Sequence, residues 1–86
     1  MNKSTLLDEI MQLVRRLGRV GPHVELTRSS RLVEDLAIDS LDLVGMILQI
    51  QDDYGVVIED DDVTMLRTIA ELTSYVEARR ENSAAA

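Results

Sequence analysis

The stretch "VEDLAIDSLDLVGMILQIQDDYG", residues 33–55, organises this 86-residue chain. After Asp39 and Ser40, its apolar residues recur at three- and four-residue steps, the period of an amphipathic helix. Asp39 is a suitable N-cap, and Asp42 three residues later completes a capping-box-like pair. Gly55 is a suitable stop. We therefore predict a helix that begins at Asp39 or Ser40 and runs to about residue 53.

Two apolar stripes run along this predicted helix when successive residues are placed about 100° apart around its axis. The core stripe comprises Leu43, Met46, Ile47, Ile50 and Tyr54. The second stripe, about 130° further round, comprises Leu41, Val44 and Leu48. A small bundle seldom buries so wide an arc of one helix, so some of the second stripe should be exposed beside acidic residues, as in a transient docking surface. The alternative is that a loop or a short helix covers Leu41 and Leu48.

An amphipathic helix and a long loop precede this segment. Residues 4–18 carry apolar side chains at helical spacing, with Ser4 or Thr5 as the cap and Gly18 as the stop. The following loop is marked by Gly, Pro, Thr and Ser, and a loop of such length is often functional. Its apolar residues are spaced as if to pin it onto a core: Val24, Leu26, Leu32 and Leu36.

The last third of the chain predicts two more helices. We expect a short helix over residues 59–66. Thr68 with Glu71 predicts the capping box of a last helix. The buried stripe of that helix comprises Ile69, Leu72, Tyr75 and Val76. We predict an all-α fold, a small bundle of three main helices plus one short helix, with the long loop between helices 1 and 2. Residues 1–80 should form a single domain, and residues 81–86 a disordered C-terminal tail.

Composition excludes several classes of protein. The chain has no cysteine, which rules out disulfides, thiolate metal sites and a protein thiol nucleophile, and the expected compartment is the cytoplasm. No apolar run approaches the roughly 18 residues of a membrane span, and the N-terminal stretch is too polar for a secretory signal. With no Phe and no Trp, the core must be aliphatic.

The net charge of −7 is concentrated in the middle of the chain. Residues 32–62 hold ten acidic side chains and no basic one. This segment repels phosphates, so nucleic acid and anionic membranes are poor partners, whereas a basic protein surface is attracted. The alternative is that the acidic excess only aids solubility. We expect a monomer.

Ser40 is a poor candidate for a catalytic nucleophile. Such a serine needs a base within hydrogen-bond reach, and the sole histidine, His23, falls in the loop. Ser40 also lacks a glycine elbow of the G-x-S-x-G kind. A phosphate on its hydroxyl is chemically reasonable, because a helix N-terminus favours anions, although Asp39 and Asp42 oppose the charge. The alternative is that Ser40 is an ordinary first-turn residue.

The acidic run "DDYGVVIEDDD" does not match a calcium loop. With Gly55 at the sixth, turn position of an EF-hand loop, the first ligand would be Ile50 and the fifth would be Tyr54. We therefore expect no dedicated metal site.

The segment "EDLAIDSLDLVGMILQIQDDYGVVI" resembles the signature of the acyl carrier proteins, with Asp-Ser-Leu at the head of the second helix. The similarity extends from about Leu32 to Val76, and the N-terminal helix and long loop agree in layout. The triplet by itself is common. It becomes specific when joined to the upstream "VEDL", the aliphatic helix, the acidic "IEDDD" turn and the "T-I-x-x-L" start of the last helix.

The resemblance implies a carrier that is not an enzyme. Ser40 would take 4′-phosphopantetheine from coenzyme A through a phosphopantetheinyl transferase (a holo-carrier synthase), and the thiol of the arm would carry acyl groups as thioesters. The positions that match partner-binding residues are Asp39, Leu41, Asp42, Val44, Leu48, Asp52 and Asp61. The residues that would line the core or an acyl-chain cavity are Leu32, Ile47, Ile50, Ile58, Leu66 and Ile69.

Three positions depart from the fatty-acid carriers. Those proteins usually have Glu in place of Gly45, an acid in place of Gln51 and Phe in place of Tyr54. The changes thin the acidic ridge of the second helix, so they favour a specialised carrier for a polyketide, a modified lipid or an unusual acyl chain.

Three other functions remain open at this point. A peptidyl or aminoacyl carrier would use the same arm for a different cargo. An unmodified acidic helical adaptor would bind a basic partner, and its function would survive Ser40→Ala, whereas a carrier would lose all function with its fold preserved. A hydrolase would turn over a simple ester unaided.

Overall fold

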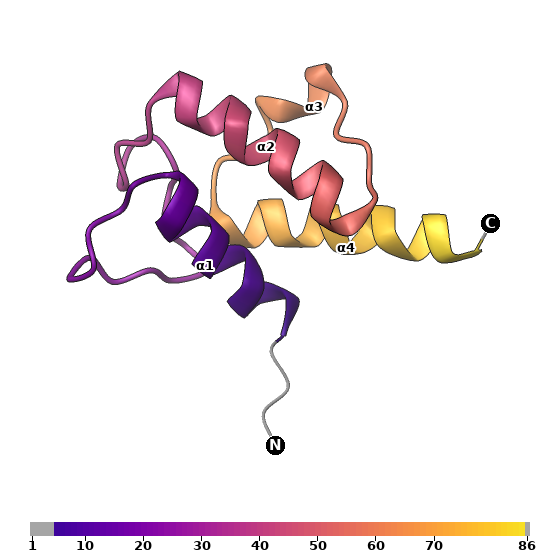
Figure 1. Ribbon diagram of the computed structural model, residues 1–86, viewed down its shortest axis with the longest axis horizontal. Helices are drawn as coiled ribbons and strands as arrows, with labels where there is room; N and C mark the ends of the chain where they lie inside the picture. The colour runs from indigo at the N-terminus through magenta and orange to yellow at the C-terminus, as the bar shows by residue number, and fades with distance from the viewer. Residues whose placement is uncertain (1–4, 86) are drawn as a thin grey trace.

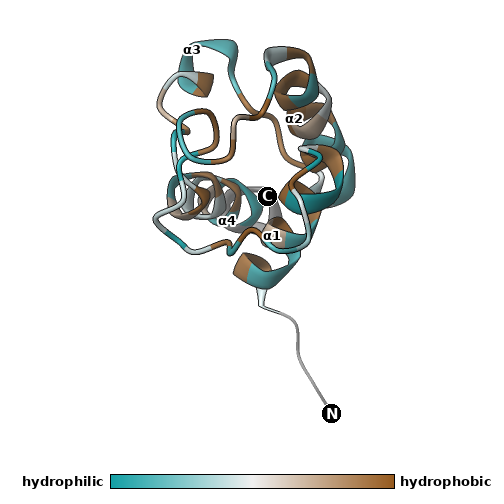
Figure 2. Cartoon of the chain, turned by 90° about the vertical axis from the view of Figure 1, so that its left-hand side faces the viewer, coloured by the Kyte–Doolittle hydropathy of each residue, from teal (hydrophilic) through white to brown (hydrophobic). Residues whose placement is uncertain are grey.

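The computed structural model describes the backbone of residues 5–85 and the side chains of residues 5–80. This part of the chain forms four helices: α1 (Leu6–Leu17), α2 (Ser40–Tyr54), α3 (Asp60–Val63) and α4 (Ile69–Ala85). α1 packs against both α2 and α4, and Figure 1 shows α2 above α4. Viewed from the side in Figure 2, α3 and α4 occupy one half of the molecule and α1 and α2 the other. The predicted all-α bundle of three main helices and one short helix is confirmed.

The ends of α1 follow from local chemistry. Thr5 is the N-cap, and its Oγ1 accepts a hydrogen bond from the Asp8 N–H at 3.1 Å. The alternative cap, Ser4, lies outside the described residues. Gly18 ends the helix as predicted, and its N–H donates to the Val14 carbonyl at 2.8 Å. Gly18 is required there by close packing, because a Cβ at this position would lie 2.8 Å from the Cδ1 of Ile38.

The predicted capping box at the start of α2 is wrong. Asp39 is the N-cap residue, but its side chain makes no capping hydrogen bond. Asp42 instead faces Arg19, with 3.7 Å between its Oδ2 and the arginine Nε. The C-terminal prediction holds, because Gly55 caps the helix in the left-handed conformation, at a φ of 63°. That conformation is open to glycine at little steric cost.

α4 begins with the predicted capping box. The Thr68 Oγ1 accepts from the Glu71 N–H, and the Glu71 Oε1 accepts from the Thr68 N–H, both at 3.1 Å. The same Oε1 also accepts from the Arg67 N–H at 2.9 Å. Helical backbone continues through Ala85, further than the apolar pattern indicated. Disorder of the tail over 81–86 stays a prediction, and residue 86 lies outside the described part.

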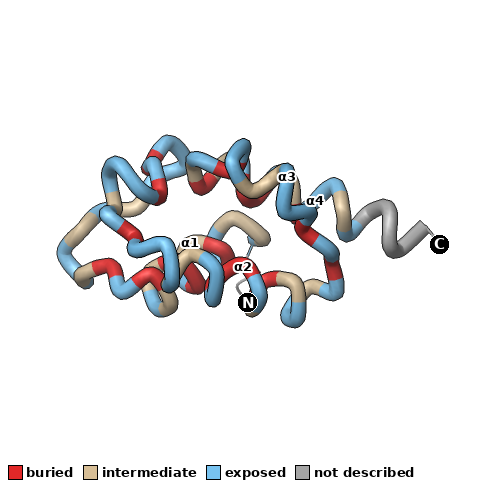
Figure 3. The backbone as a smooth tube through the Cα atoms, turned by 90° about the horizontal axis from the view of Figure 1, so that it is seen from above, coloured by how far each residue is buried: buried red, intermediate tan, exposed pale blue. Residues whose placement is uncertain are grey.

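The core is entirely aliphatic, as the composition requires. Buried positions recur along the long helices and in the loop, separated by exposed ones (Figure 3). The predicted core stripe of α2 is confirmed, since Met46, Ile47 and Ile50 are buried and Leu43 and Tyr54 pack half-buried against them. The core comprises Ile10, Leu13, Val14, Val20, Leu32, Ile38, Met46, Ile47, Ile50, Val56, Ile58, Leu66, Ile69, Leu72 and Val76.

The loop over 18–39 is tied down near its start and further along at Leu32. Arg15 of α1 donates to the carbonyls of Gly21 and Val24. The Leu32 N–H donates to the Arg67 carbonyl at 2.8 Å, which joins the loop to the segment before α4. The predicted pins are confirmed: Leu32 is buried, while Val24, Leu26 and Leu36 pack half-buried on the core. The anchored loop thereby positions the start of α2.

Candidate functional site

Ser40 is the first residue of α2, and it is exposed. No hydrogen bond joins its hydroxyl to another of the described side chains, His23 included. The Leu43 N–H donates to the Asp39 carbonyl at 2.8 Å, which leaves the N–H groups before it without partners inside the helix. Ser40 therefore presents its hydroxyl beside an electropositive helix end, and none of the described side chains is hydrogen-bonded to it as the base of a nucleophile would be.

The acidic pair around Ser40 is unequal. Asp39 is exposed, whereas the Asp42 side chain is only 25% exposed and lies against Arg19. Arg19 reaches this place from the turn after Gly18, where its own φ of 57° turns the chain sharply. The guanidinium offsets part of the negative charge near the hydroxyl, which the sequence pattern did not indicate.

The second apolar stripe of α2 is exposed. Leu41, Val44 and Leu48 are 78%, 56% and 57% exposed, so neither α3 nor the loop covers them. This outcome excludes the alternative in which they are buried. Asp39 at one end and Asp52 at the other are also exposed, as is Asp61 on α3. We call the stripe and these exposed acids together the α2 ridge.

A groove of about 150 Å³ separates α2 from α3. It is lined mainly by apolar side chains, with Gln51 and Asp60 as its polar members. Among the six predicted cavity residues, all of which are buried, Ile47 and Ile58 line this groove. The full lining comprises Leu43, Val44, Ile47, Leu48, Gln51, Ile58, Asp60 and Val63.

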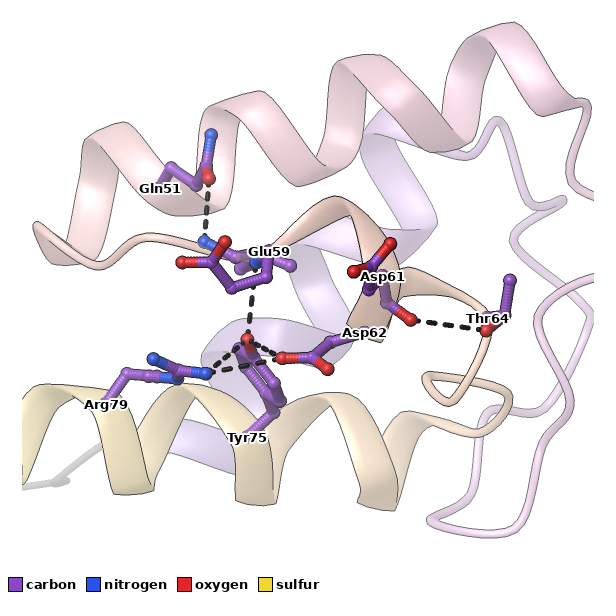
Figure 4. Close-up of polar contacts among 8 residues, drawn as sticks. Gln51, Glu59, Asp61, Asp62, Thr64, Tyr75 and Arg79 are labelled. Carbon is purple, nitrogen blue, oxygen red and sulfur yellow. Dashed lines mark hydrogen bonds and ion pairs between the residues drawn. The ribbon is translucent and has the colours of Figure 1, made fainter.

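A polar network joins α3 to α4 (Figure 4). The Tyr75 hydroxyl donates to Asp62 Oδ2 at 2.7 Å and accepts from the Glu59 N–H at 3.3 Å and from Arg79 at 2.8 Å. The Arg79 guanidinium also pairs with Asp62 at 3.3 Å and lies 4.7 Å from the centre of the Tyr75 ring. On the other side, Gln51 Oε1 accepts from the Ile58 N–H at 2.7 Å. Hydrogen bonds thus fix α3 and the segment before it to both neighbouring helices.

Both tyrosines have raised pKa values. Burial, followed by the hydrogen bond to Glu9, raises the pKa of Tyr54 to about 12. The Tyr54 hydroxyl donates to Glu9 Oε1 at 2.8 Å, so it connects α2 to α1. Burial also raises the pKa of Tyr75, and the hydrogen bond to Asp62 acts in the same direction. The raised pKa values extend the neutral, donating form of each hydroxyl to higher pH.

The Tyr75 network is another feature that the sequence pattern did not indicate. The prediction placed Tyr75 in the buried stripe of the last helix, and its ring is half-buried there. Tyr75 and Arg79 are four residues apart on α4, a spacing that puts both on one face of a helix. That spacing was the available signal, but the partner Asp62 lies 13 residues before Tyr75, and only the packing brings it close.

Among the side chains of residues 5–80, no cluster of three or more His, Asp or Glu residues is arranged to hold a metal ion. None of the described helices combines the length and apolar character that crossing a membrane requires.

Comparisons with known proteins identify the family of the chain. A family model for the phosphopantetheine attachment site matches residues 8–76, a range that includes Ser40. An acyl carrier protein of Rhodococcus erythropolis is 35% identical over 72 residues, which cover 84% of this chain and 78% of the relative. The meromycolate extension acyl carrier protein of Mycobacterium tuberculosis is 30% identical over 83 residues, which cover 96% of this chain and 71% of the relative. The chain therefore belongs to the acyl carrier protein family, whose members are carriers rather than enzymes and bear 4′-phosphopantetheine.

Proposed function

We propose that Ser40 carries the 4′-phosphopantetheine and that the chain delivers acyl groups, bound as thioesters, to enzymes of fatty acid, polyketide or specialised lipid biosynthesis. The observation that carries this proposal is the free, exposed hydroxyl at the first residue of α2, within the part of the chain that matches the attachment-site model. The chain has no cysteine, so the thiol that bears the acyl group has to come from the arm. The proposed compartment is the cytoplasm.

The surroundings of Ser40 suit a phosphodiester. Unpaired N–H groups and the helix dipole at the start of α2 favour an anion on this hydroxyl. The exposed Asp39 opposes that charge, while the pairing of Asp42 with Arg19 reduces the opposition from the second acid. The arm supplies the thiol that forms the thioester. Ser40 itself supplies only the oxygen through which the arm is attached.

The α2 ridge is the proposed docking surface for partner enzymes. Its exposed leucine and valine side chains provide apolar area, and the acids around them attract a basic patch and steer its approach. The transferase that attaches the arm and the enzymes that process the acyl group would share this surface, since both must reach Ser40. Asp42 would contribute less charge than Asp39, Asp52 and Asp61, because Arg19 already faces it.

Of the three departures from the fatty-acid carriers, Gly45 bears most directly on partner choice. Gly45 lies on the ridge between Leu41 and Leu48, and a Cβ there would meet no atom within 4 Å. Gln51 instead accepts from the Ile58 N–H, and Tyr54 is bound to Glu9. A glycine on the ridge removes a negative charge and lets a partner approach the helix backbone closely, which favours a specialised set of enzymes.

The test is intact mass after incubation with coenzyme A, magnesium and a broad-specificity phosphopantetheinyl transferase. We expect the chain to gain one phosphopantetheine and Ser40→Ala to gain none, with the far-UV circular dichroism of both apo forms unchanged. A verified transferase that leaves the chain unmodified would contradict the proposal and favour an unmodified acidic adaptor. A gain that persists in Ser40→Ala would move the attachment to another hydroxyl.

A further inference from the structure

The groove between α2 and α3 lies on the face of α2 that carries Ser40. Leu43, Val44 and Ile47 follow Ser40 by three, four and seven residues, the steps that keep side chains on one face of a helix. Gln51, the most distant lining residue of α2, is about 16 Å from Ser40 along the helix axis. A flexible arm on Ser40 that runs along this face would reach the groove, whose mainly apolar lining can shelter what the arm carries.

The size of the groove limits what it can take. Its volume of about 150 Å³ matches that of an apolar protein cavity known to bind benzene, a molecule of about six carbons. A longer acyl chain would need one wall of the groove to move. The α2 wall is part of the core, because Met46, Ile47 and Ile50 on that helix are buried.

The α3 wall is the one able to move. None of the four residues of α3 is buried, and Val63 alone packs half-buried on the core. The buried residues nearest to it are Ile58 on one side, 5% exposed, and Leu66 on the other, 7% exposed. α3 is therefore a short segment suspended between two anchors, with little apolar packing of its own.

Polar contacts hold that wall in place, and two of them meet at one hydroxyl group. Tyr75 binds both Asp62 inside α3 and the Glu59 N–H just before it, and Arg79 reinforces the contact with Asp62 (Figure 4). A tyrosine hydroxyl has one donor and two acceptor positions, and this network occupies all three. Removing the hydroxyl oxygen would break the link from Tyr75 to Asp62 and the link to the Glu59 N–H in a single step, and would leave only the Arg79–Asp62 pair between α4 and α3 among the described contacts.

We propose that Tyr75 sets the length of the acyl chain that the groove shelters, by holding α3 closed over a space for about six carbons. While the Tyr75 network is intact, longer acyl groups extend past the groove into solvent or to the partner enzyme. This inference rests on the proposed function, because it assumes a cargo attached through Ser40. It assigns Tyr75 a positioning role: the side chain acts on the cargo through α3 without touching it.

The test compares the chain with Tyr75→Phe and with Tyr54→Phe as a matched control. Both substitutions remove one tyrosine hydroxyl, but Tyr54 binds Glu9 on α1 and has no hydrogen bond to α3. Each protein is converted to the holo form and loaded with saturated acyl groups of about four to about twelve carbons, which bracket the estimate from the groove volume. The measurements are the methyl NMR shifts of Ile47 and Ile58, which line the groove, and the Tm of each acyl form.

In the unaltered protein, we expect the methyl shifts to increase with the length of the acyl group up to about six carbons and then to stay constant. In Tyr75→Phe the methyl shifts should continue to increase with longer acyl groups. Tyr54→Phe should show the same dependence on acyl length as the unaltered protein. Circular dichroism checks that each variant is folded. If Tyr75→Phe does not fold, Asp62→Ala removes the acceptor from the α3 side at a half-exposed position and should give the same extended profile.

Coincident profiles for the unaltered chain and Tyr75→Phe, or shifts of the unaltered chain that keep growing to the longest acyl group, would overturn this inference while leaving the carrier function intact. A chain that gains no phosphopantetheine would overturn the proposed function and this inference with it. The mass measurement before acylation separates the two cases.

Discussion

Replacing Gly45 by alanine should stabilise the protein. Gly45 is exposed in the middle of α2, and a Cβ added there meets no atom within 4 Å, so the substitution introduces no clash. Glycine in a helix interior is less favourable than alanine by about 0.8–1 kcal/mol. Gly45→Ala should therefore raise the free energy of unfolding by about 1 kcal/mol, which for a domain of this size corresponds to a Tm increase of about 4–8 °C.

The assay is urea unfolding of the apo protein followed by far-UV circular dichroism, with thermal melts alongside. The urea midpoint should rise with an unchanged m-value, because the surface exposed on unfolding barely changes. Gly18→Ala is the contrasting variant: its Cβ would lie 2.6 Å from the Val14 carbonyl oxygen and 2.8 Å from the Ile38 Cδ1. Such overpacking costs about 1–3 kcal/mol, so this variant should lose stability. An equal or lower midpoint for Gly45→Ala would refute the reasoning, since it would mean that residue 45 has neighbours.

Three further predictions concern single contacts. The pKa of Tyr54 is raised to about 12 from a usual value of 10.0, so the stability it contributes is present below pH 10 and is lost as the pH rises toward 12. In Tyr54→Phe, the free energy of unfolding, measured by urea unfolding at a series of pH values, should decline less over this pH range. The same decline in both proteins would contradict the prediction. Gly55→Ala places a Cβ on a left-handed residue and should lower the free energy of unfolding by about 1 kcal/mol, visible as a lower Tm. Thr68→Ala removes the bond from the Glu71 N–H and should cost about 1 kcal/mol; a melting curve that superimposes on that of the unaltered chain would disprove the role of the cap.

The helices were predictable because their signals are local. Thr5, Gly18, Gly55 and the Thr68–Glu71 pair each act on backbone groups within a few residues, and the structure has all of them at helix ends. The exposure of the second stripe on α2 was also predictable, because a helix with apolar residues over so wide an arc exceeds what two neighbouring helices bury. These features depend on spacing along the chain, which the sequence states directly.

The expected capping box at Asp39 failed for an equally physical reason. Asp42 has two possible electrostatic partners, the backbone at the helix start and any cation that the fold brings near. The turn after α1 places Arg19 within 3.7 Å, and that pairing replaces the local one. Sequence spacing described only the first of these partners, since Arg19 is 23 positions away in the chain.

The sequence by itself therefore determined the helical class, the aliphatic core, the exposed hydroxyl at the head of the second helix and the acidic apolar ridge beside it. Only the tertiary structure decided which polar groups meet: Tyr54 with Glu9, 45 residues apart, and Tyr75 with Asp62 and the Glu59 N–H. A side chain's place on its own helix follows from a fixed angle per residue, but its partners on other helices depend on how those helices pack. The contacts of Tyr75 that fix α3, and with them the proposed limit on the length of the acyl group, depend on this packing of helices.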